Sequence, residues 1–165
     1  MNILYITMNS HLRSTSTILD AVFSELVPEK VNPIIVFPEE GPWQRDLEDR
    51  GFNIYITDFF MPDKKHPVKF FKMLIFWRKI IRKHQIDIIH VNEHDLYPMF
   101  RHISYLLKVP VIVGVHFLVR KGYGYWAFAG NYRPSKILFT SRYQLGRSRE
   151  GMPPNVDESN IAVIA

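Results

Sequence analysis

Seven short stretches of the sequence are apolar at consecutive positions, and longer stretches with apolar residues at every third or fourth position lie between them. Consecutive apolar residues are typical of parallel strands, which are covered on both faces. The predicted strands are residues 3–7, 33–37, 53–57, 87–91, 109–115, 136–140 and 161–164. The predicted helices are residues 16–26, 41–50, 68–83, 96–107 and 141–150. Their alternation predicts an α/β fold, a Rossmann-like, doubly wound parallel sheet of about seven strands with helices on both faces.

Helix and strand signals agree with these boundaries. The hydroxyl side chains of residues 14–16 offer N-caps for the first helix, Gly51 follows the second, and Pro110 opens a strand at a position that tolerates a missing N–H. With 165 residues, of which 47% are apolar, residues 1–165 are expected to form a single Rossmann-like domain. Only one short strand follows the loop-like residues 151–160, so we expect the natural chain to continue.

Composition excludes several kinds of site. The sequence has no cysteine, which rules out disulfides, thiolate zinc sites and a cysteine nucleophile. Its first residues run directly into a predicted strand without the features of a signal peptide, and no apolar run of about 18 residues occurs. These features predict a cytoplasmic protein.

The net charge of +5 arises in one segment. Eight basic and no acidic residues lie between Lys64 and His84, whereas the rest of the chain holds 13 basic and 16 acidic residues. The helix predicted there has an apolar stripe that packs on the sheet, made of Phe70, Met73, Leu74, Trp77, Ile80 and Ile81. Apolar side chains also remain beside its lysine face, at Phe71, Ile75 and Phe76. This pattern fits either contact with an anionic membrane or a solvated basic face, and no nucleic-acid-binding module accompanies the charge.

Polar side chains follow three of the predicted strands at the point where each strand ends. In an open parallel sheet, ligands bind at the carboxyl ends of the strands, where loops and helix N-termini meet. The candidates are Ser10 and His11 after the first strand, Asn92, Glu93, His94 and Asp95 after the fourth, and His116 after the fifth. Each residue taken singly also fits a solvated loop, and His90 fits a core histidine. Together they predict a binding site on this rim.

Two other patterns lack the context that their chemistry needs. His90, Glu93 and His94 do not have the spacing of a helical zinc motif, so no metal site is expected. Residues 122–127, GYGYWA, match G-x-G-x-x-A, but they lie several residues beyond their strand and no acidic residue follows about 20 positions later. A mobile loop that covers the site is the better interpretation of this segment.

With these segments identified, the chain resembles the N-terminal domain of a GT-B glycosyltransferase, in particular the retaining group of family 4. The resemblance rests on NILYITMNSH, IDIIHVNEHD and VPVIVGVHF, and on the segment from ILFTSRYQLG to the end of the chain, and it spans essentially the whole sequence. It implies two Rossmann-like domains that face each other across a cleft, with the nucleotide-sugar domain after residue 165. It further implies a sugar or lipid-linked acceptor, no cofactor besides the donor, and no nucleic acid.

The resemblance also implies roles for individual residues. His116 matches the family's histidine beside the donor sugar, and Asn92, Glu93 and His94 stand in a substrate-binding loop. Residues 10–16 match a first loop that is normally glycine-rich, but here it carries Ser10, His11, Arg13 and Ser14, which would contact substrate through side chains. Two alternatives remain: a stand-alone flavodoxin-like binding or regulatory module without catalysis, and half of a GT-B sugar-nucleotide epimerase.

A basic helix at residues 68–83 would place the enzyme at the inner face of the membrane.

Overall fold

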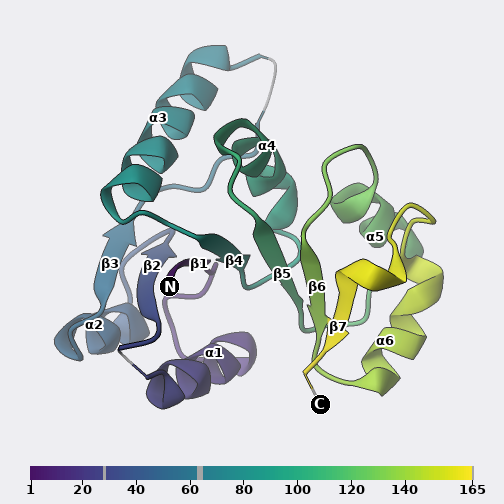
Figure 1. Ribbon diagram of the computed structural model, residues 1–165, viewed down its shortest axis with the longest axis horizontal. Helices are drawn as coiled ribbons and strands as arrows, with labels where there is room; N and C mark the ends of the chain where they lie inside the picture. Colours follow the sequence, from purple (N-terminus) through teal and green to yellow (C-terminus); the bar gives the residue numbers. More distant parts are fainter. Residues whose placement is uncertain (28, 63–64, 165) are drawn as a thin grey trace. The chain divides into compact units, whose positions relative to one another are not determined.

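The protein has the predicted α/β fold. The computed structural model describes residues 1–27, 29–62 and 65–164. Its strands are β1 (Asn2–Ile6), β2 (Asn32–Phe37), β3 (Asn53–Ile56), β4 (Ile88–Val91), β5 (Val111–Val115), β6 (Lys136–Phe139) and β7 (Ile161–Val163) (Figure 1). They form a seven-stranded sheet in the order β3-β2-β1-β4-β5-β6-β7. The β1–β2, β2–β3, β5–β6 and β6–β7 pairs are all parallel. The predicted fold class is therefore confirmed.

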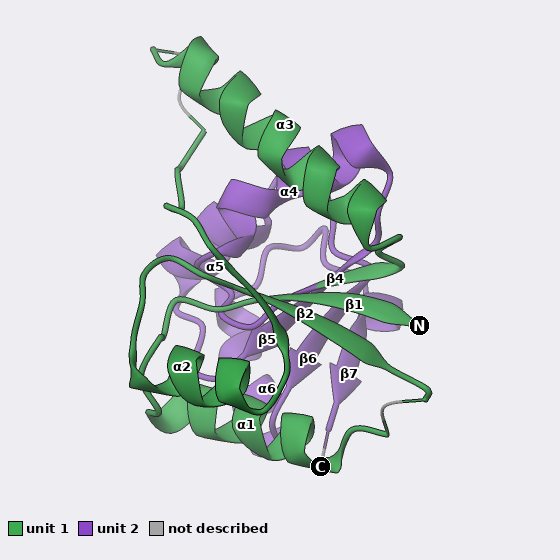
Figure 2. Cartoon of the chain, turned by 90° about the vertical axis from the view of Figure 1, so that its left-hand side faces the viewer, with its two compact units in different colours: residues 1–89 green, residues 90–165 purple. Residues whose placement is uncertain are grey.

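Helices connect these strands. The α-helices are α1 (Ser14–Glu25), α2 (Pro42–Asp49), α3 (Pro67–Lys83), α4 (Tyr97–Leu107), α5 (Lys121–Phe128) and α6 (Arg142–Ser148), and the short 3-10 helices are η1 (Arg149–Gly151) and η2 (Glu158–Asn160). None of the helices in the described part of the chain is long and apolar enough to cross a membrane. The chain divides into two compact units, residues 1–89 and residues 90–165 (Figure 2).

In the first unit, both faces of the strands are covered. Side chains of α1 and α2 pack with alternate residues of β1 and β2 in one cluster made of Tyr5, Leu19, Phe23, Ile35, Phe37, Trp43 and Leu47. Helix α3 lies on the other side of the strands (Figure 2) and buries Trp77, Ile80 and Ile81. Because both faces are covered, β2 is fully buried at four consecutive residues, which is the pattern that predicted a parallel strand.

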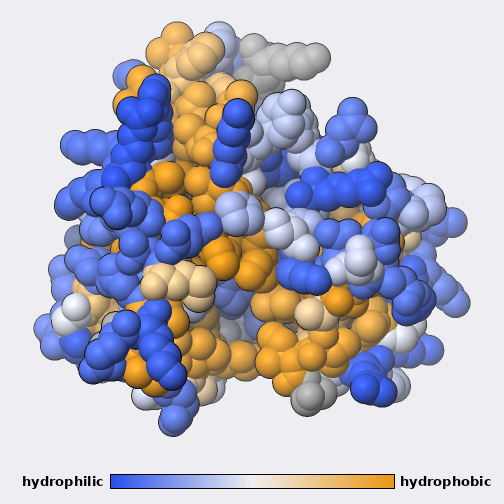
Figure 3. Space-filling view, viewed as in Figure 1, coloured by the Kyte–Doolittle hydropathy of each residue, from blue (hydrophilic) through white to orange (hydrophobic). Residues whose placement is uncertain are grey.

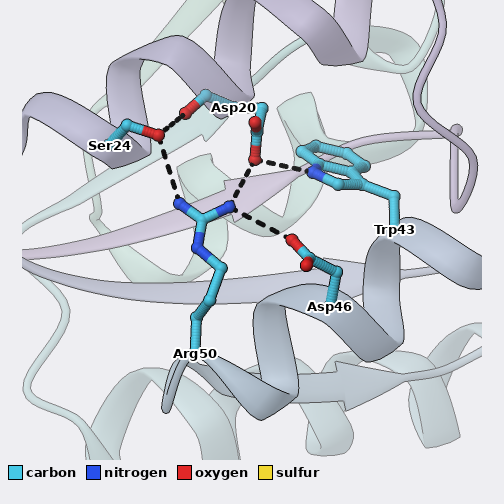
Figure 4. A network of polar contacts seen from close by, with 5 residues as sticks. All are labelled: Asp20, Ser24, Trp43, Asp46 and Arg50. Carbon is cyan, nitrogen blue, oxygen red and sulfur yellow. Dashed lines mark hydrogen bonds and ion pairs between the residues drawn. The ribbon is translucent and has the colours of Figure 1, made fainter.

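A charged network joins α1 to α2 above this cluster (Figure 4). The Asp20 carboxylate accepts hydrogen bonds from the Trp43 indole N–H at 2.9 Å and from the Arg50 guanidinium at 2.7 Å. Arg50 also donates to Asp46 at 3.2 Å and to the Ser24 hydroxyl at 3.3 Å. Asp20 is therefore the one acceptor that both a core indole and a guanidinium share.

We expect the substitution Asp20→Ala to lower the free energy of unfolding by about 1–3 kcal/mol, because two donors lose their acceptor and one of them is charged. Urea denaturation followed by circular dichroism measures the change. The matched control is Asp49→Ala, which removes an exposed carboxylate from the end of α2. Equal stabilities of the two variants would show that the network contributes nothing.

In the second unit, helix α4 and helix α6 lie on opposite sides of the strands (Figure 2). Helix α6 begins as the sequence predicts, because the Ser141 hydroxyl accepts a hydrogen bond from the backbone N–H of Gln144 at 3.1 Å. Helix α4 ends at Lys108, whose φ of +56° places it in the left-handed region. The second unit, which carries the polar loops after β4 and β5, therefore has helices with defined ends.

One predicted segment is wrong. The sequence of residues 122–127 suggested a mobile loop, but these residues lie inside α5. The reason is tertiary packing: a Cβ atom on Gly124 would lie 2.0 Å from the Gly151 carbonyl oxygen and 2.7 Å from a Val119 methyl group. Glycine at this position lets the helix approach η1 closely, so this glycine serves packing and not loop flexibility.

Candidate functional site

Two polar side chains meet where β4 and β5 end in the second unit. The amide oxygen of Asn92 lies 3.2 Å from Nε2 of His116, and the amide nitrogen of Asn92 donates to the Glu93 carboxylate at 2.7 Å. Asn92 and Glu93 are both buried, with 2% and 7% of their surface exposed. Gly114 allows this approach, since a Cβ there would lie 2.5 Å from the Asn92 carbonyl oxygen. Asn92, Glu93 and His116 thus form one buried chain of hydrogen bonds.

This chain of hydrogen bonds fixes the tautomer of His116. Because the Asn92 amide group donates to Glu93, its oxygen is the atom that faces His116, and Nε2 of His116 must carry the proton. The lone pair of the neutral imidazole then lies on Nδ1. That atom is buried and has no hydrogen-bond partner among the described residues. Nδ1 of His116 therefore keeps a lone pair that no described residue uses.

Burial keeps the neighbouring histidines neutral. It lowers the pKa of His116, against a smaller opposing effect of a hydrogen bond to the Asn92 backbone. It also lowers the pKa of His94, where the Asp95 carboxylate opposes it. The pKa of half-buried His90, in β4, is lowered to about 4, first by burial and then by the positive charge that His116 would carry. Burial therefore favours neutral imidazoles at pH 7, and a positive charge on His116 would lower the pKa values of His90 and His94 further.

Aromatic rings hold His94 in place. Its imidazole stacks on the ring of Phe128 at 17° and 6.4 Å between centroids, and it meets the edge of Tyr123 at 5.3 Å. Burial raises the pKa of Tyr123, and so do the charge of Asp95 and a hydrogen bond to that carboxylate. His94 is only 5% exposed, so its ring forms part of the wall of the site.

Gln144 positions the backbone on both sides of His116, and the sequence analysis missed this residue. Its amide nitrogen donates to the carbonyl oxygens of Val115 at 3.0 Å and of Phe117 at 3.2 Å. Its amide oxygen accepts from the N–H and the hydroxyl of Thr140. The S-x-x-Q pattern of Ser141 and Gln144 is a capping-box signal, but the Gln144 side chain reaches the neighbouring strand end instead of the cap.

In the first unit, the loop after β1 docks on the N-terminus of α2. The Ser10 carbonyl oxygen accepts hydrogen bonds from the backbone N–H groups of Trp43 at 3.0 Å and Gln44 at 3.4 Å. Ser10 is 1% exposed, and a Cβ on Gly41 would lie 2.4 Å from its hydroxyl oxygen. That hydroxyl lies 3.3 Å from Nδ1 of His11. The Ser10 carbonyl oxygen thus satisfies two backbone N–H groups at the start of α2. Without this loop conformation, those N–H groups would be open to solvent or to a ligand.

The start of α1 differs from the prediction. Arg13, and not one of the hydroxyl residues 14–16, occupies the N-cap position. The buried Ser16 hydroxyl instead reaches back and accepts a hydrogen bond from the Arg13 N–H at 2.6 Å, while it donates to backbone carbonyl oxygens. His11, Arg13 and Ser14 remain exposed at this helix start. Their joining the site around His116 stays a prediction.

No metal-binding cluster appears in the described ranges, where no group of three or more His, Asp or Glu residues is placed to hold an ion. Asn92, Glu93 and His116 are instead bonded to one another. The arrangement offers hydrogen-bond acceptors, one of them unused, and so suits a ligand with hydroxyl groups.

Solved structures of several other proteins share the fold of this chain. The chain superimposes on the Anabaena protein HepE in complex with UDP-glucose, with a TM-score of 0.74, 12% identity, and coverage of 99% of this chain and 43% of that one. It also matches a glycosyltransferase from Rickettsia africae (TM-score 0.69, 15% identity, 99% and 42% coverage) and the lipopolysaccharide outer core galactosyltransferase WaaB (0.66, 14%, 99% and 45%). The chain spans less than half the length of these proteins.

A putative UDP-N-acetylglucosamine 2-epimerase from Listeria monocytogenes shares the fold as well, with a TM-score of 0.54, 12% identity, and coverage of 97% of this chain and 43% of that one. At such identities these likenesses show the fold alone. No curated protein matches the sequence. A family match is nevertheless extensive, since residues 18–165 fit the pattern of one family of sugar-transferring enzymes. The chain belongs to Glycosyltransferase Family 4, with the fold of the N-terminal half of GT-B glycosyltransferases.

Proposed function

We propose that this chain is the N-terminal, acceptor-side domain of an enzyme that transfers a hexosyl unit from a nucleotide sugar to a sugar or lipid-linked acceptor. The observation that carries the proposal is the buried Nδ1 atom of His116, which has no partner in the described part of the chain and lies beside Asn92 at the carboxyl ends of two strands. Family membership supports the same reading. The donor-binding domain would follow residue 165.

Each residue of the candidate site has a separate role in this proposal. His116 would accept a hydrogen bond from a sugar hydroxyl at Nδ1, which orients the glycosyl group as its bond to the diphosphate breaks. Asn92 would hold the imidazole tautomer through Nε2, with Glu93 orienting Asn92. His94 would shape the pocket. Ser10, His11, Arg13 and Ser14 would contact substrate from the first loop, where exposed Arg13 offers a guanidinium to phosphate.

The complete protein tests this proposal. Incubated with UDP-glucose and other radiolabelled nucleotide sugars and with a lipid extract as acceptor, it should release nucleoside diphosphate and label the acceptor fraction. Conversion of the nucleotide sugar into its epimer, detected by NMR, would favour the epimerase alternative. Neither reaction, across the donor panel, would favour a binding module without catalysis.

The 165-residue chain alone should bind nucleoside diphosphates with dissociation constants no tighter than about millimolar, worth roughly 4 kcal/mol. The proposed donor half is absent from it, and one domain alone supplies only one wall of the cleft. Most of the contacts that would position the nucleotide are therefore missing. Isothermal titration calorimetry with UDP and GDP measures the affinity, with the complete protein as the positive control. Micromolar binding by this chain would contradict the half-enzyme proposal.

Helix α3 suggests a location at the inner face of a membrane. Val68, Phe71 and Ile75 are each 60–68% exposed on this helix, and lysines flank them. Apolar side chains gather over α3 in Figure 3, edged by hydrophilic ones. The predicted inward stripe is confirmed, since its six residues are all buried or half-buried, whereas Lys64 lies outside the described residues. An exposed apolar row between lysines suits the headgroup region of an anionic bilayer.

We therefore expect the chain to sediment with vesicles that contain phosphatidylglycerol, and this binding should weaken as salt rises, because exposed charge is screened. The double substitution Phe71→Ser/Ile75→Ser should reduce the bound fraction at low salt by roughly tenfold, because it removes the apolar anchors. Ile18→Ser and Val22→Ser on α1, also exposed, form the matched control. Equal loss in both double variants would contradict a specific role for α3.

A further inference from the structure

A polar cavity lies in the second unit, between α4 and the loop that precedes β6. It has a volume of about 460 Å³, and its lining consists of Arg101, Ser104, Tyr105, Asn131, Tyr132 and Arg133. Two of these six residues are cationic and none is acidic. Because the loop leads into the amino end of β6, the cavity stands at the opposite end of the strands from Asn92 and His116.

Arg101 uses few of its hydrogen-bond donors. A guanidinium carries five N–H groups in a planar fork. In the described structure, one donates to the Ala129 carbonyl oxygen at 3.4 Å, and Nε is buried without a partner. A buried donor without an acceptor is costly, and the cost is removed if a ligand supplies the acceptor. The Arg101 guanidinium, which lines the cavity, therefore has N–H groups left to donate to an oxyanion.

The loop opposite Arg101 is held rigidly. The carbonyl oxygen of Tyr132 accepts a hydrogen bond from the Tyr97 hydroxyl at 3.1 Å, and the Asn155 amide donates to the Gly130 carbonyl oxygen at 3.1 Å. The ring of Tyr132 meets the rings of His102 and Tyr105 on α4, at 4.9 and 4.7 Å between centroids. These contacts fix Asn131 and Arg133, which flank Tyr132, so the cavity wall is formed before any ligand arrives.

One carboxylate lies near the cavity without filling it. The pKa of Asp157 is lowered mainly by hydrogen bonds from Ser159, and the charge of Arg133 adds the smallest contribution. Asp157 is thus engaged by its own turn, where its carboxylate accepts from the Ser159 N–H at 2.9 Å. Arg133 keeps its donors available to a ligand, and it is exposed.

We propose that this cavity is a binding site for the phosphate group of a small ligand or lipid, separate from the sugar-transfer site. Arginine forks match the oxygens of phosphate, and Asn131 adds a neutral donor, whereas the Ser104 hydroxyl already donates to the Val109 carbonyl oxygen at 2.6 Å. The tyrosine rings would pack against the part of the ligand that bears the phosphate. Binding of a phosphate in this cavity would not require Asn92 or His116.

The test uses two soluble probes on the 165-residue chain: inorganic pyrophosphate, and dihexanoyl phosphatidic acid below its micelle concentration. Isothermal titration calorimetry should show saturable binding of at least one probe. Arg101→Ala and Arg133→Gln should each weaken it by tenfold or more, since each removes a charged hydrogen-bond donor. Arg147→Ala, which removes an exposed arginine of the same unit on α6, is the matched control and should bind as the parent does.

Each result decides something. Tighter Arg133-dependent binding of the lipid probe identifies a phospholipid headgroup, and tighter binding of pyrophosphate identifies a free phosphate compound. Arg133 is exposed, so its variant is expected to fold even if Arg101→Ala does not, and a melting scan confirms this. His116→Ala should leave both affinities unchanged. The proposal is overturned if neither probe binds. It is also overturned if the parent, Arg133→Gln and Arg147→Ala bind a probe with equal affinity.

Discussion

Replacing His116 by alanine should lower the turnover number of the complete enzyme by more than roughly tenfold while its melting temperature changes little. The imidazole holds a buried acceptor, Nδ1, that has no hydrogen-bond partner among the described residues. Its loss therefore costs the protein only hydrogen bonds to Asn92, one of them to the amide oxygen at 3.2 Å, but costs the substrate an oriented partner.

The control for this variant is His84→Gln. His84 bonds the Tyr55 hydroxyl at 2.7 Å in the first unit and has no proposed role in the reaction. Steady-state kinetics at saturating donor, together with melting scans, separates catalysis from folding. Asn92→Ala should also lower turnover, because the imidazole tautomer is no longer held, and its effect should not add fully to that of His116→Ala. Equal activity of His116→Ala and parent would remove this residue from the site.

Acidification should destabilise the fold through His90. The pKa of this histidine is about 4 in the folded chain, against an ordinary value of 6.5, and the main cause is burial. Between these values the unfolded chain binds a proton that the folded chain does not, so stability is complete above pH 6.5 and falls as the pH drops toward 4. The loss attributable to His90 is at most on the order of 3 kcal/mol.

Urea denaturation at intervals from pH 4 to pH 8 measures this dependence. His94 and His116 add to it in the same direction, because burial lowers their pKa values too. The variant His90→Gln keeps a polar side chain but cannot gain a proton, so its stability should fall less than that of the parent below pH 6.5. Curves that stay parallel from pH 8 to pH 4 would show that His90 does not titrate with folding.

Much of the site was predictable because strand ends are predictable. A buried run that stops at polar residues indicates where a parallel strand meets its loop, and this placed Asn92, Glu93 and His116 at strand ends. The contact between Asn92 and His116, which are 24 positions apart, depended on the placement of neighbouring strands in the sheet, and local sequence does not encode that placement. Gln144 was not predicted for the same reason, because its partners Val115 and Phe117 lie at the end of β5 and in the loop after it, 29 and 27 positions earlier in the chain.

Local sequence determined the parallel α/β architecture, because covering both faces of a strand requires consecutive apolar residues, and such runs are visible along β1, β2 and β5. It also determined the inward stripe of α3. Tertiary structure alone decided that residues 122–127 form a helix, because the space that Gly124 must leave is defined by Gly151. It also decided that Nε of Arg101 is buried without an acceptor: the charge of Arg101 is evident from the sequence, but the number of acceptors around its guanidinium follows from the fold.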